Sequence, residues 1–216
     1  MHPGPETAPG EGRFAELLAL PGVCEDLELR STFGFMAFHG GSLEQVTDVV
    51  AAGAAEQAGA SYYGVRQPAG LQWHLPSTQI GPAGSPRLRA FLDHVEVVVA
   101  VHGYGRAGRW TSLLLGGGNR PLAAHLASHL APALPDYEMV DDLARIPPEL
   151  RGQHPRNPVN LPPGGGVQLE LPPRVRGRSP LSPPAGPDGL SAPTGALIAA
   201  LAAAARAWPI GDDASA

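Results

Sequence analysis

The sequence has few of the features that would mark out several common classes of protein. It contains one cysteine, Cys24, which excludes an internal disulfide. Its fifteen basic residues are all arginine and its formal net charge is −5, so no basic stripe for nucleic acid is present. No run reaches the roughly 20 apolar residues of a membrane helix, and the first residues lack the cationic and apolar regions of a secretory signal. We therefore expect no binding to nucleic acid or membrane and a cytoplasmic location by default, with release by lysis or another route left open.

Hydrophobic residues make up 43% of the 216 residues, enough for a substantial core. Apolar segments typical of strands alternate along the chain with segments of helical periodicity, which predicts an α/β fold. We expect a single domain over residues 13–208, with a mixed, mostly parallel sheet and helices on both faces. Residues 1–12 are expected to form a disordered lead and residues 209–216 a tail. Residues 172–192 are dense in Pro, Gly, Ser and Arg, which predicts an extended segment.

The predicted elements follow from local patterns. Runs rich in β-branched and aromatic residues predict strands at 34–38, 61–66, 71–75, 95–103, 110–118 and 166–172. Helical periodicity predicts helices at 13–20, 43–59, 86–94, 120–134 and 193–208. Ser42, with Gln45 three residues later, fits a capping box at the start of the second helix.

Two strand candidates end in the same way, with a histidine followed by glycine. They are "FMAFHGG", which places His39, and "VVAVHGYG", which places His102. In a parallel sheet both histidines would lie at carboxyl ends of strands, where open α/β sheets carry their sites. Glu44 is expected in the first turn of the next helix, and the glycine turn can fold it back beside His39. Two imidazoles and one carboxylate are the ligands of hydrolytic zinc sites that keep a position for water. The alternatives are histidines bonded to backbone groups and a solvated Glu44 that complements the helix dipole.

Glu170 lies in the strand candidate "GVQLELP", where Val167, Leu169 and Leu171 alternate with Gln168 and Glu170. The apolar set can face one layer, which leaves the carboxylate on the opposite face. A carboxylate in that place needs a partner or a function. Beside a metal site it would act as a general base. The alternative is an edge strand with one wet face.

The linear order of five segments resembles the phage-type poly-γ-glutamate hydrolase family, over about residues 20–206. The segments are "FHGGSLEQVTDVVA", "LQWHLPST", "VVVAVHGY", "LLLGGGNRPLAAHLASHL" and "NPVNLPPGGGVQLELPPRVR". The resemblance implies a zinc carboxypeptidase-like fold, one zinc ion held by His39, Glu44 and His102, and Glu170 as general base. It departs from zinc carboxypeptidases in one respect, because five residues rather than three separate the first histidine from the glutamate. The turn that carries Glu44 must therefore differ.

Five further residues are candidates for binding substrate. Asn119 and Arg120 stand at a predicted helix N-terminus, a favourable place for a carboxylate, and the same dipeptide binds substrate carboxylates in some zinc carboxypeptidases. The alternative is a tight strand-to-helix connection. His74 is expected to point toward the site, away from Trp73. Arg174 and Arg176 follow Glu170 closely and would recognise a glutamyl carboxylate, unless they are plain loop charges.

Three functions remain open on these grounds. The first is a zinc-dependent amide hydrolase that cleaves γ-glutamyl bonds in an anionic polymer or peptide, as the resemblance implies. The second is a deacylase of N-acyl amino acids that uses the same site. The third is a metal-binding relative without catalysis, against which Glu170 argues, because a pure binder does not need an unliganded base. Oligomeric state, substrate chain length and glutamate stereochemistry have no sequence signal.

Overall fold

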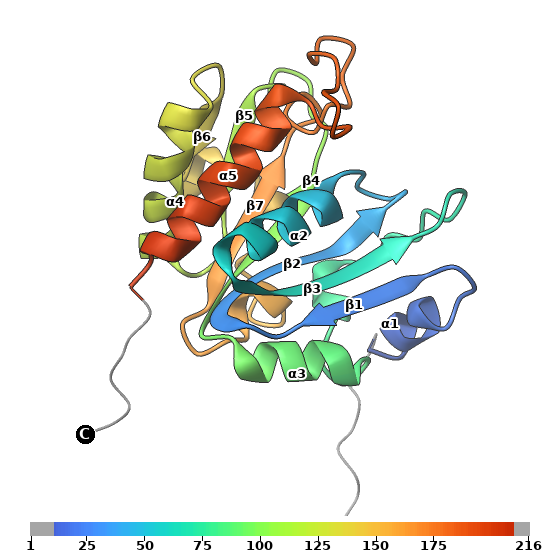
Figure 1. Cartoon of the computed structure of the whole chain (residues 1–216). Helices are drawn as coiled ribbons and strands as arrows, with labels where there is room; N and C mark the ends of the chain where they lie inside the picture. Colours follow the sequence, from blue (N-terminus) through green and yellow to red (C-terminus); the bar gives the residue numbers. More distant parts are fainter. Residues whose placement is uncertain (1–10, 210–216) are drawn as a thin grey trace, which may run out of the picture.

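The computed structural model describes residues 11–209, which form five α-helices around one seven-stranded sheet (Figure 1). The predicted lead and tail lie outside this range, apart from residues 11, 12 and 209. The strands are β1 (Cys24–Glu28), β2 (Ser31–Gly41), β3 (Ala60–Gln67), β4 (Val97–Gly103), β5 (Ser112–Leu115), β6 (Glu138–Val140) and β7 (Gly166–Leu171). The helices are α1 (Glu11–Leu18), α2 (Thr47–Ala58), α3 (Pro86–His94), α4 (Arg120–Ala133) and α5 (Ala192–Ala207).

The sheet is mixed and mostly parallel, as the alternating pattern predicts. Its strand order is β1-β3-β2-β4-β7-β5-β6. Strands β3, β2, β4 and β7 are parallel neighbours, and β5 pairs in parallel with β6. The antiparallel pairs are β1 with β3 and β5 with β7. The carboxyl ends of β2, β4 and β7 therefore meet at one edge of the sheet.

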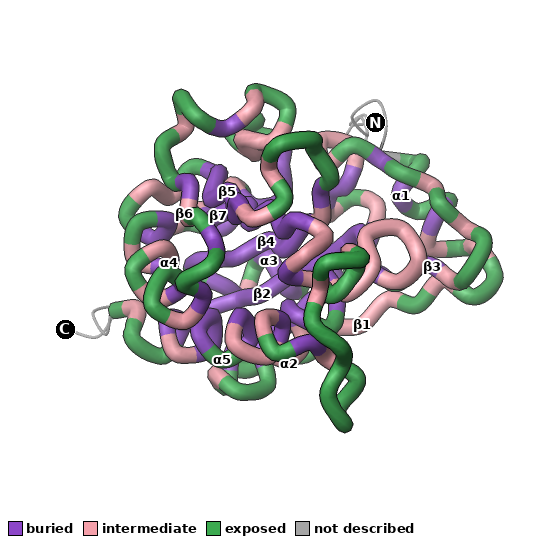
Figure 2. The backbone as a smooth tube through the Cα atoms, turned by 90° about the horizontal axis from the view of Figure 1, so that it is seen from above, coloured by how far each residue is buried: buried purple, intermediate pink, exposed green. Residues whose placement is uncertain are grey.

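Strand β4 shows why the central strands read as unbroken apolar runs. Val97, Val99 and Val101 belong to one hydrophobic cluster, whereas Val98 and Ala100 belong to the cluster on the opposite face. A strand covered on both faces has no solvent side and needs no polar alternation. Figure 2 shows the buried strands β2, β4 and β7 running through the centre of the molecule.

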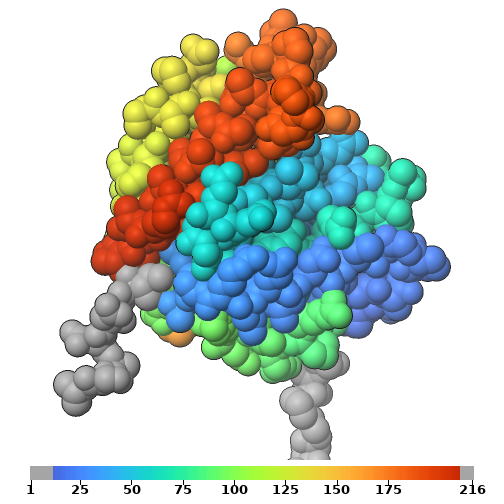
Figure 3. All heavy atoms as spheres, viewed as in Figure 1, coloured from blue at the N-terminus to red at the C-terminus, as the bar shows by residue number. Residues whose placement is uncertain are grey.

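Helices cover both faces of the sheet. Helices α2, α4 and α5 contribute to the first cluster, and α1 and α3 contribute to the second. Figure 3 shows α5 running beside α2 across the front of the molecule, with α4 next to it. A Cβ atom on Gly53 of α2 would lie 3.2 Å from the Ile198 side chain of α5, so the small residue permits this close packing.

Three segments differ from the sequence prediction. Residues 71–75 are not a strand, because the side-chain amide of Gln67 binds both the N–H and the C=O of Trp73 (2.9 Å each) and takes the place of a strand partner. Strands β1 and β6 were not expected. Both are edge strands, and β1 is acidic and largely solvated, without the apolar alternation that marks a strand.

Residues 172–190 contain turns and no helix or regular strand, and a single bridge joins Ala185 to Ser191 just before α5. Within residues 11–209, no helix combines the length and the hydrophobicity needed to cross a membrane.

Candidate active site

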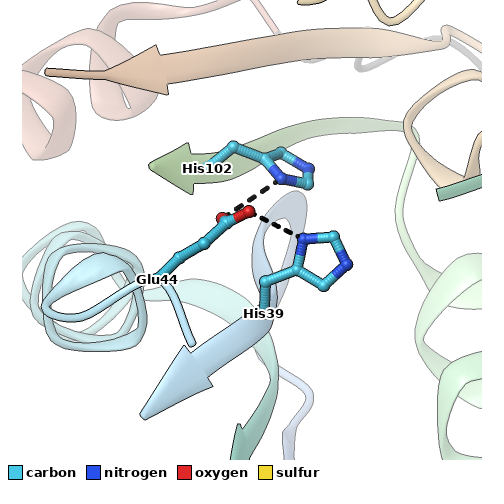
Figure 4. A group of neighbouring side chains, drawn as sticks. All are labelled: His39, Glu44 and His102. Atoms are coloured by element: carbon cyan, nitrogen blue, oxygen red, sulfur yellow. Dashed lines mark hydrogen bonds and ion pairs between the residues drawn. The ribbon is translucent and has the colours of Figure 1, made fainter. Parts of the chain in front are cut away.

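Three side chains from separate segments meet at the carboxyl edge of the sheet. His39 comes from the end of β2, His102 from the end of β4, and Glu44 from the turn after β2 (Figure 4). The Nδ1 atom of His39 lies 3.0 Å from Oε1 of Glu44, and Nδ1 of His102 lies 3.4 Å from Oε2. One ligand atom from each residue lies within 4.8 Å of the other two. The group is compact enough to hold one metal ion.

The turn after β2 brings Glu44 back toward His39. Its geometry depends on Gly41, which has φ +70° and whose Cβ would lie 2.3 Å from the carbonyl oxygen of Gln67. The Glu44 N–H donates to the carbonyl of His39 (2.8 Å), which closes the turn across the five-residue spacing. Ser42 does not cap a helix, because its hydroxyl donates to carbonyls of the neighbouring loop. The predicted capping box is therefore wrong: α2 begins only at Thr47, and Glu44 lies before it.

Hydrogen bonding fixes how His39 presents its ring. Its Nε2 lies 2.9 Å from the carbonyl oxygen of Leu75, which can only accept, so Nε2 carries a proton. In the neutral ring Nδ1 then directs a lone pair at the Glu44 carboxylate. Two acceptors at 3.0 Å need a proton or a cation between them. Metal-ligating histidines have this arrangement, with the outer ring nitrogen donating to a carbonyl, so the residues fit a metal ion.

Within this group the two imidazoles favour the charged form of the carboxylate, and the carboxylate favours the charged form of His102. Burial opposes ionisation of Glu44, but the positive charges of His39 and His102 outweigh it and hold its pKa far below the usual range. Burial likewise opposes protonation of His102, and the charge of Glu44 outweighs this penalty, so the pKa of His102 is raised. The N–H of Gly103 also donates to Oε2 of Glu44 (2.8 Å). Glu44 is thus ionised, which is the form that binds a metal, and protons compete with the metal for the histidines.

Glu170 lies next to this group on the adjacent strand. It pairs in register with His102 across the parallel β4–β7 ladder and is buried. Burial raises the pKa of its carboxyl, and Gln168 donates to its Oε1 from Nε2 (2.8 Å). Strand β7 lies between β4 and β5, so the alternative of an edge strand with a wet face is wrong. A buried carboxylate with a raised pKa beside possible metal ligands has the properties of a general base.

A cavity of about 510 Å³ opens over these residues. Residues 74–78 and residues 148–157 both contribute to its lining. Its described lining is His39, Glu44, His74, Pro76, Ser77, Thr78, His102, Gly103, Pro148, Glu149, Leu150, Gly152, Gln153, His154, Asn157, Gln168 and Glu170. Neither arginine nor lysine is among these residues, whereas the carboxylates of Glu44, Glu149 and Glu170 are, so the hydrogen-bond donors of the lining are uncharged side chains and histidines.

A family model described as poly-gamma-glutamate hydrolase matches residues 22–179. This chain belongs to that family. The match confirms the resemblance seen in the sequence and makes the protein a hydrolase. No curated protein matches the chain by sequence.

Solved structures share the fold of this hydrolase. A bacteriophage poly-gamma-glutamate hydrolase has a TM-score of 0.70 at 21% identity, over 88% of this chain and 91% of its own. The zinc-free apo form of YndL has a TM-score of 0.59 at 24% identity, over 69% and 71%. The Atu2144 gene product of Agrobacterium tumefaciens has a TM-score of 0.51 at 12% identity, over 83% and 94%. The predicted single-sheet α/β fold is confirmed.

The predicted substrate-binding residues of the hydrolase fall in different places. His74 lines the cavity, and its ring centroid lies 4.8 Å from that of His39. Partial burial and the charge of His39 lower the pKa of His74. Arg174 is not in the lining; its guanidinium lies 6.0 Å from the Tyr137 ring centroid. Arg176 is also outside the lining and donates to backbone carbonyls.

Asn119 and Arg120 use their polar atoms within the fold and do not line the cavity. The Asn119 side chain caps α4 by accepting from the Leu122 N–H (2.9 Å) and donates to the Gly164 carbonyl (2.9 Å). Arg120 donates to carbonyls at the end of β5, including Leu115 (2.9 Å). The structure thus favours the alternative reading of a tight strand-to-helix connection.

Replacing Asn119 with alanine is therefore expected to change stability and not substrate binding. Loss of an N-cap costs about 1 kcal/mol, which lowers Tm by about 2–4 °C in a chain of this size. Thermal unfolding and the Michaelis constant for a γ-glutamyl substrate measure the two effects. A raised Michaelis constant with unchanged Tm would show that Asn119 binds substrate.

Several cavity residues had no strong sequence signal. Gln168 could be placed on the polar face of its strand together with Glu170, but its contact with that carboxylate required the structure. Residues 148–157 follow an unpredicted strand and carry no regular pattern. Asn157 is held in this segment by donating to Oε1 of Gln168 (2.7 Å).

Proposed function

We propose that this hydrolase cleaves γ-glutamyl amide bonds with one zinc ion held by His39, Glu44 and His102. The observation that carries the proposal is the convergence of both Nδ1 atoms on the Glu44 carboxylate, with Glu170 on the neighbouring strand. Three protein ligands leave the open position typical of catalytic zinc sites. Zinc is further supported by a relative of this fold that was solved in a form called zinc-free. The bond type is supported by the family to which the chain belongs.

Glu170 would act as the general base. A zinc ion bound to the three ligands would lower the pKa of a water molecule and polarise the scissile carbonyl. Glu170 accepts the proton of the attacking water and then delivers it to the leaving amine. Gln168 holds Oε1 of this carboxylate and so fixes its orientation. Burial keeps its pKa raised, nearer to a working pH than that of an exposed glutamate.

Substrate carboxylates would be bound in the cavity by uncharged donors. Within residues 11–209, the side chains of Ser77, Thr78 and Gln153 form no hydrogen bond, and all three line the cavity. His154 accepts from the Arg156 N–H at Nδ1 (3.1 Å), so its neutral ring carries a proton on Nε2. These residues come from two segments that line the cavity, 74–78 and 148–157, and we assign them to substrate recognition together with the exposed His74.

The experiment that tests the function combines metal analysis with two substrates. Protein purified without chelator should contain about one zinc per chain and should shorten poly-γ-glutamate, followed by gel. Cleavage of N-acyl amino acids without cleavage of the polymer would identify the deacylase. Zinc binding without turnover of either substrate would identify a metal-binding relative, and absence of zinc even after reconstitution would overturn the proposal.

The pH profile should report the raised pKa of Glu170. The base works as a carboxylate, so kcat/KM should fall as the pH decreases through its pKa. Because burial raises that pKa, this acid limb should lie above the value of about 4.3 for a free glutamate. Zinc content measured over the same range separates this limb from protonation of the ligands. An acid limb at the ordinary carboxyl value with zinc still bound would contradict the assignment.

A further inference from the structure

Arg176 lies outside the cavity and binds three separate backbone segments. Its Nη1 donates to the carbonyl of Gln45 (2.9 Å), its Nε to that of Leu171 (3.2 Å), and its Nη2 to that of Tyr104 (3.4 Å). These residues are far apart in the sequence. One planar guanidinium thus joins the turn after β2 to the ends of β7 and β4.

Each of these three segments carries a residue of the proposed site. Gln45 directly follows Glu44, and Leu171 directly follows Glu170. Tyr104 comes two residues after His102. The guanidinium therefore donates to the residue that follows a proposed metal ligand on the turn and to the residue that follows the proposed base on β7. Its third acceptor lies two residues after a second proposed ligand on β4.

Gly103 gives independent evidence that the guanidinium of Arg176 packs against the backbone of the site. A Cβ atom there would lie 2.8 Å from Cζ of Arg176, and its three nearest atoms all belong to the guanidinium. Gly103 does not have a positive φ, so the space taken by Arg176, and not backbone strain, argues against a side chain at 103. The N–H of the same glycine donates to Oε2 of Glu44 (2.8 Å). The arginine thus packs on the peptide that holds the metal-binding carboxylate.

Arg176 is partly buried, and a guanidinium removed from water is costly unless its donors are used. Burial lowers the pKa of Arg176, and the charge of Glu44 opposes this effect. Among the described residues no carboxylate forms an ion pair with Arg176. Its N–H groups instead donate to backbone carbonyls. A planar fork with several fixed donors can join separate segments in this way, whereas a lysine ammonium cannot span them.

We propose that Arg176 is a positioning residue that sets the metal affinity of the site by holding the segments of Glu44, His102 and Glu170 in register. This inference rests on the proposed function for the identity of the metal and for the ligands that hold it. Outer partners of metal ligands typically change affinity by about 10–100-fold when they are lost. Arg176 does not contact the ligand side chains as such partners do; it acts through the backbone that carries the ligands.

The test is the zinc dissociation constant of the full chain, measured by competition with a chromophoric chelator. Arg176→Ala and Arg176→Lys are both expected to weaken zinc binding by about 10–100-fold. Arg120→Ala is the matched control, because Arg120 also donates to backbone carbonyls at a strand end but touches no segment of the site. It should lower Tm and leave the zinc dissociation constant unchanged.

A second variant tests the mechanism without removing the arginine. Gly103→Ala should displace the guanidinium and weaken zinc binding. In the Arg176→Ala background the same substitution should change the zinc affinity little, because the guanidinium that the new Cβ would meet is absent. This non-additivity is the expected sign of direct coupling. If both Arg176 variants bind zinc within about two-fold of wild type, or if the two losses simply add, the inference is wrong. A wild type that binds no zinc would instead overturn the proposed function itself.

Discussion

Replacement of Glu170 by glutamine is expected to lower kcat by about 10²–10⁴-fold while zinc content stays at the wild-type level. Glutamine keeps the volume and one acceptor of the side chain but cannot take a proton. The attacking water then loses its proton acceptor, and the leaving amine loses its proton donor. Metal analysis and turnover of poly-γ-glutamate on the same preparation measure the two quantities.

Stability gives a third measurement on this variant. The folded-state pKa of Glu170 is raised, so ionisation of this carboxyl costs stability as the pH rises above its unfolded value. Glutamine removes that cost, and Tm at neutral pH should be unchanged or higher. A loss of activity with retained zinc and retained Tm therefore points to proton transfer.

Glu149→Gln is the matched control for Glu170→Gln. Glu149 lines the same cavity, but it is exposed and paired with Arg106 at the surface. Its replacement should lower kcat far less. If Glu170→Gln loses its zinc, Glu170 is a metal ligand and the role of Glu44 must be reassigned. Full activity with full zinc in Glu170→Gln would place the base elsewhere.

The sequence was sufficient for the central part of the fold because burial leaves strong patterns there. Strand β4 is buried on both faces, so its apolar run "VVVAV" was unambiguous, and the histidine after it marked the strand end. His39 and His102 could be paired before the structure was known because parallel strands end at the same edge of a sheet. The structure brings both beside Glu44.

The peripheral segments were predicted poorly because their structure depends on distant partners. Residues 71–75 look like a strand, yet the amide of Gln67 binds their backbone. Ser42 looks like a helix cap, yet its hydroxyl reaches the carbonyl of Pro68. In both cases a contact between segments replaced the local pattern. Such contacts have no periodicity by which a single sequence could reveal them.

The arginines illustrate the same limit for the site. Arg120 and Arg176 were predicted to bind substrate because their charge suits a carboxylate, but both donate to backbone carbonyls. A guanidinium serves either purpose, and sequence spacing does not distinguish them. Apart from the carboxylates of Glu44, Glu149 and Glu170, the cavity lining offers hydroxyl, amide and imidazole groups. This suggests that recognition of an anionic substrate depends on uncharged donors and the metal more than on arginine.

Replacement of either proposed histidine ligand is expected to abolish stoichiometric zinc binding and, with it, activity. His39→Ala and His102→Ala each leave two protein ligands where structural and catalytic zinc sites use at least three. Both side chains lie at the end of a strand, so the sheet should still form, although His39→Ala also loses the bond to the Leu75 carbonyl. Circular dichroism checks folding, and metal analysis after dialysis against zinc measures occupancy.

His74→Ala is the control that separates a ligand from a neighbour. The centroid of the His74 ring lies 4.8 Å from that of His39, but His74 is exposed and comes from a loop. If it only contacts substrate, its loss should raise the Michaelis constant and leave one zinc per chain. If it were a fourth ligand, its loss would weaken zinc binding, and the position that a catalytic zinc keeps for water would be closed in the wild type. If His39→Ala or His102→Ala kept one zinc per chain while His74→Ala lost it, the metal would lie nearer to His74, and the proposed ligand set would be wrong.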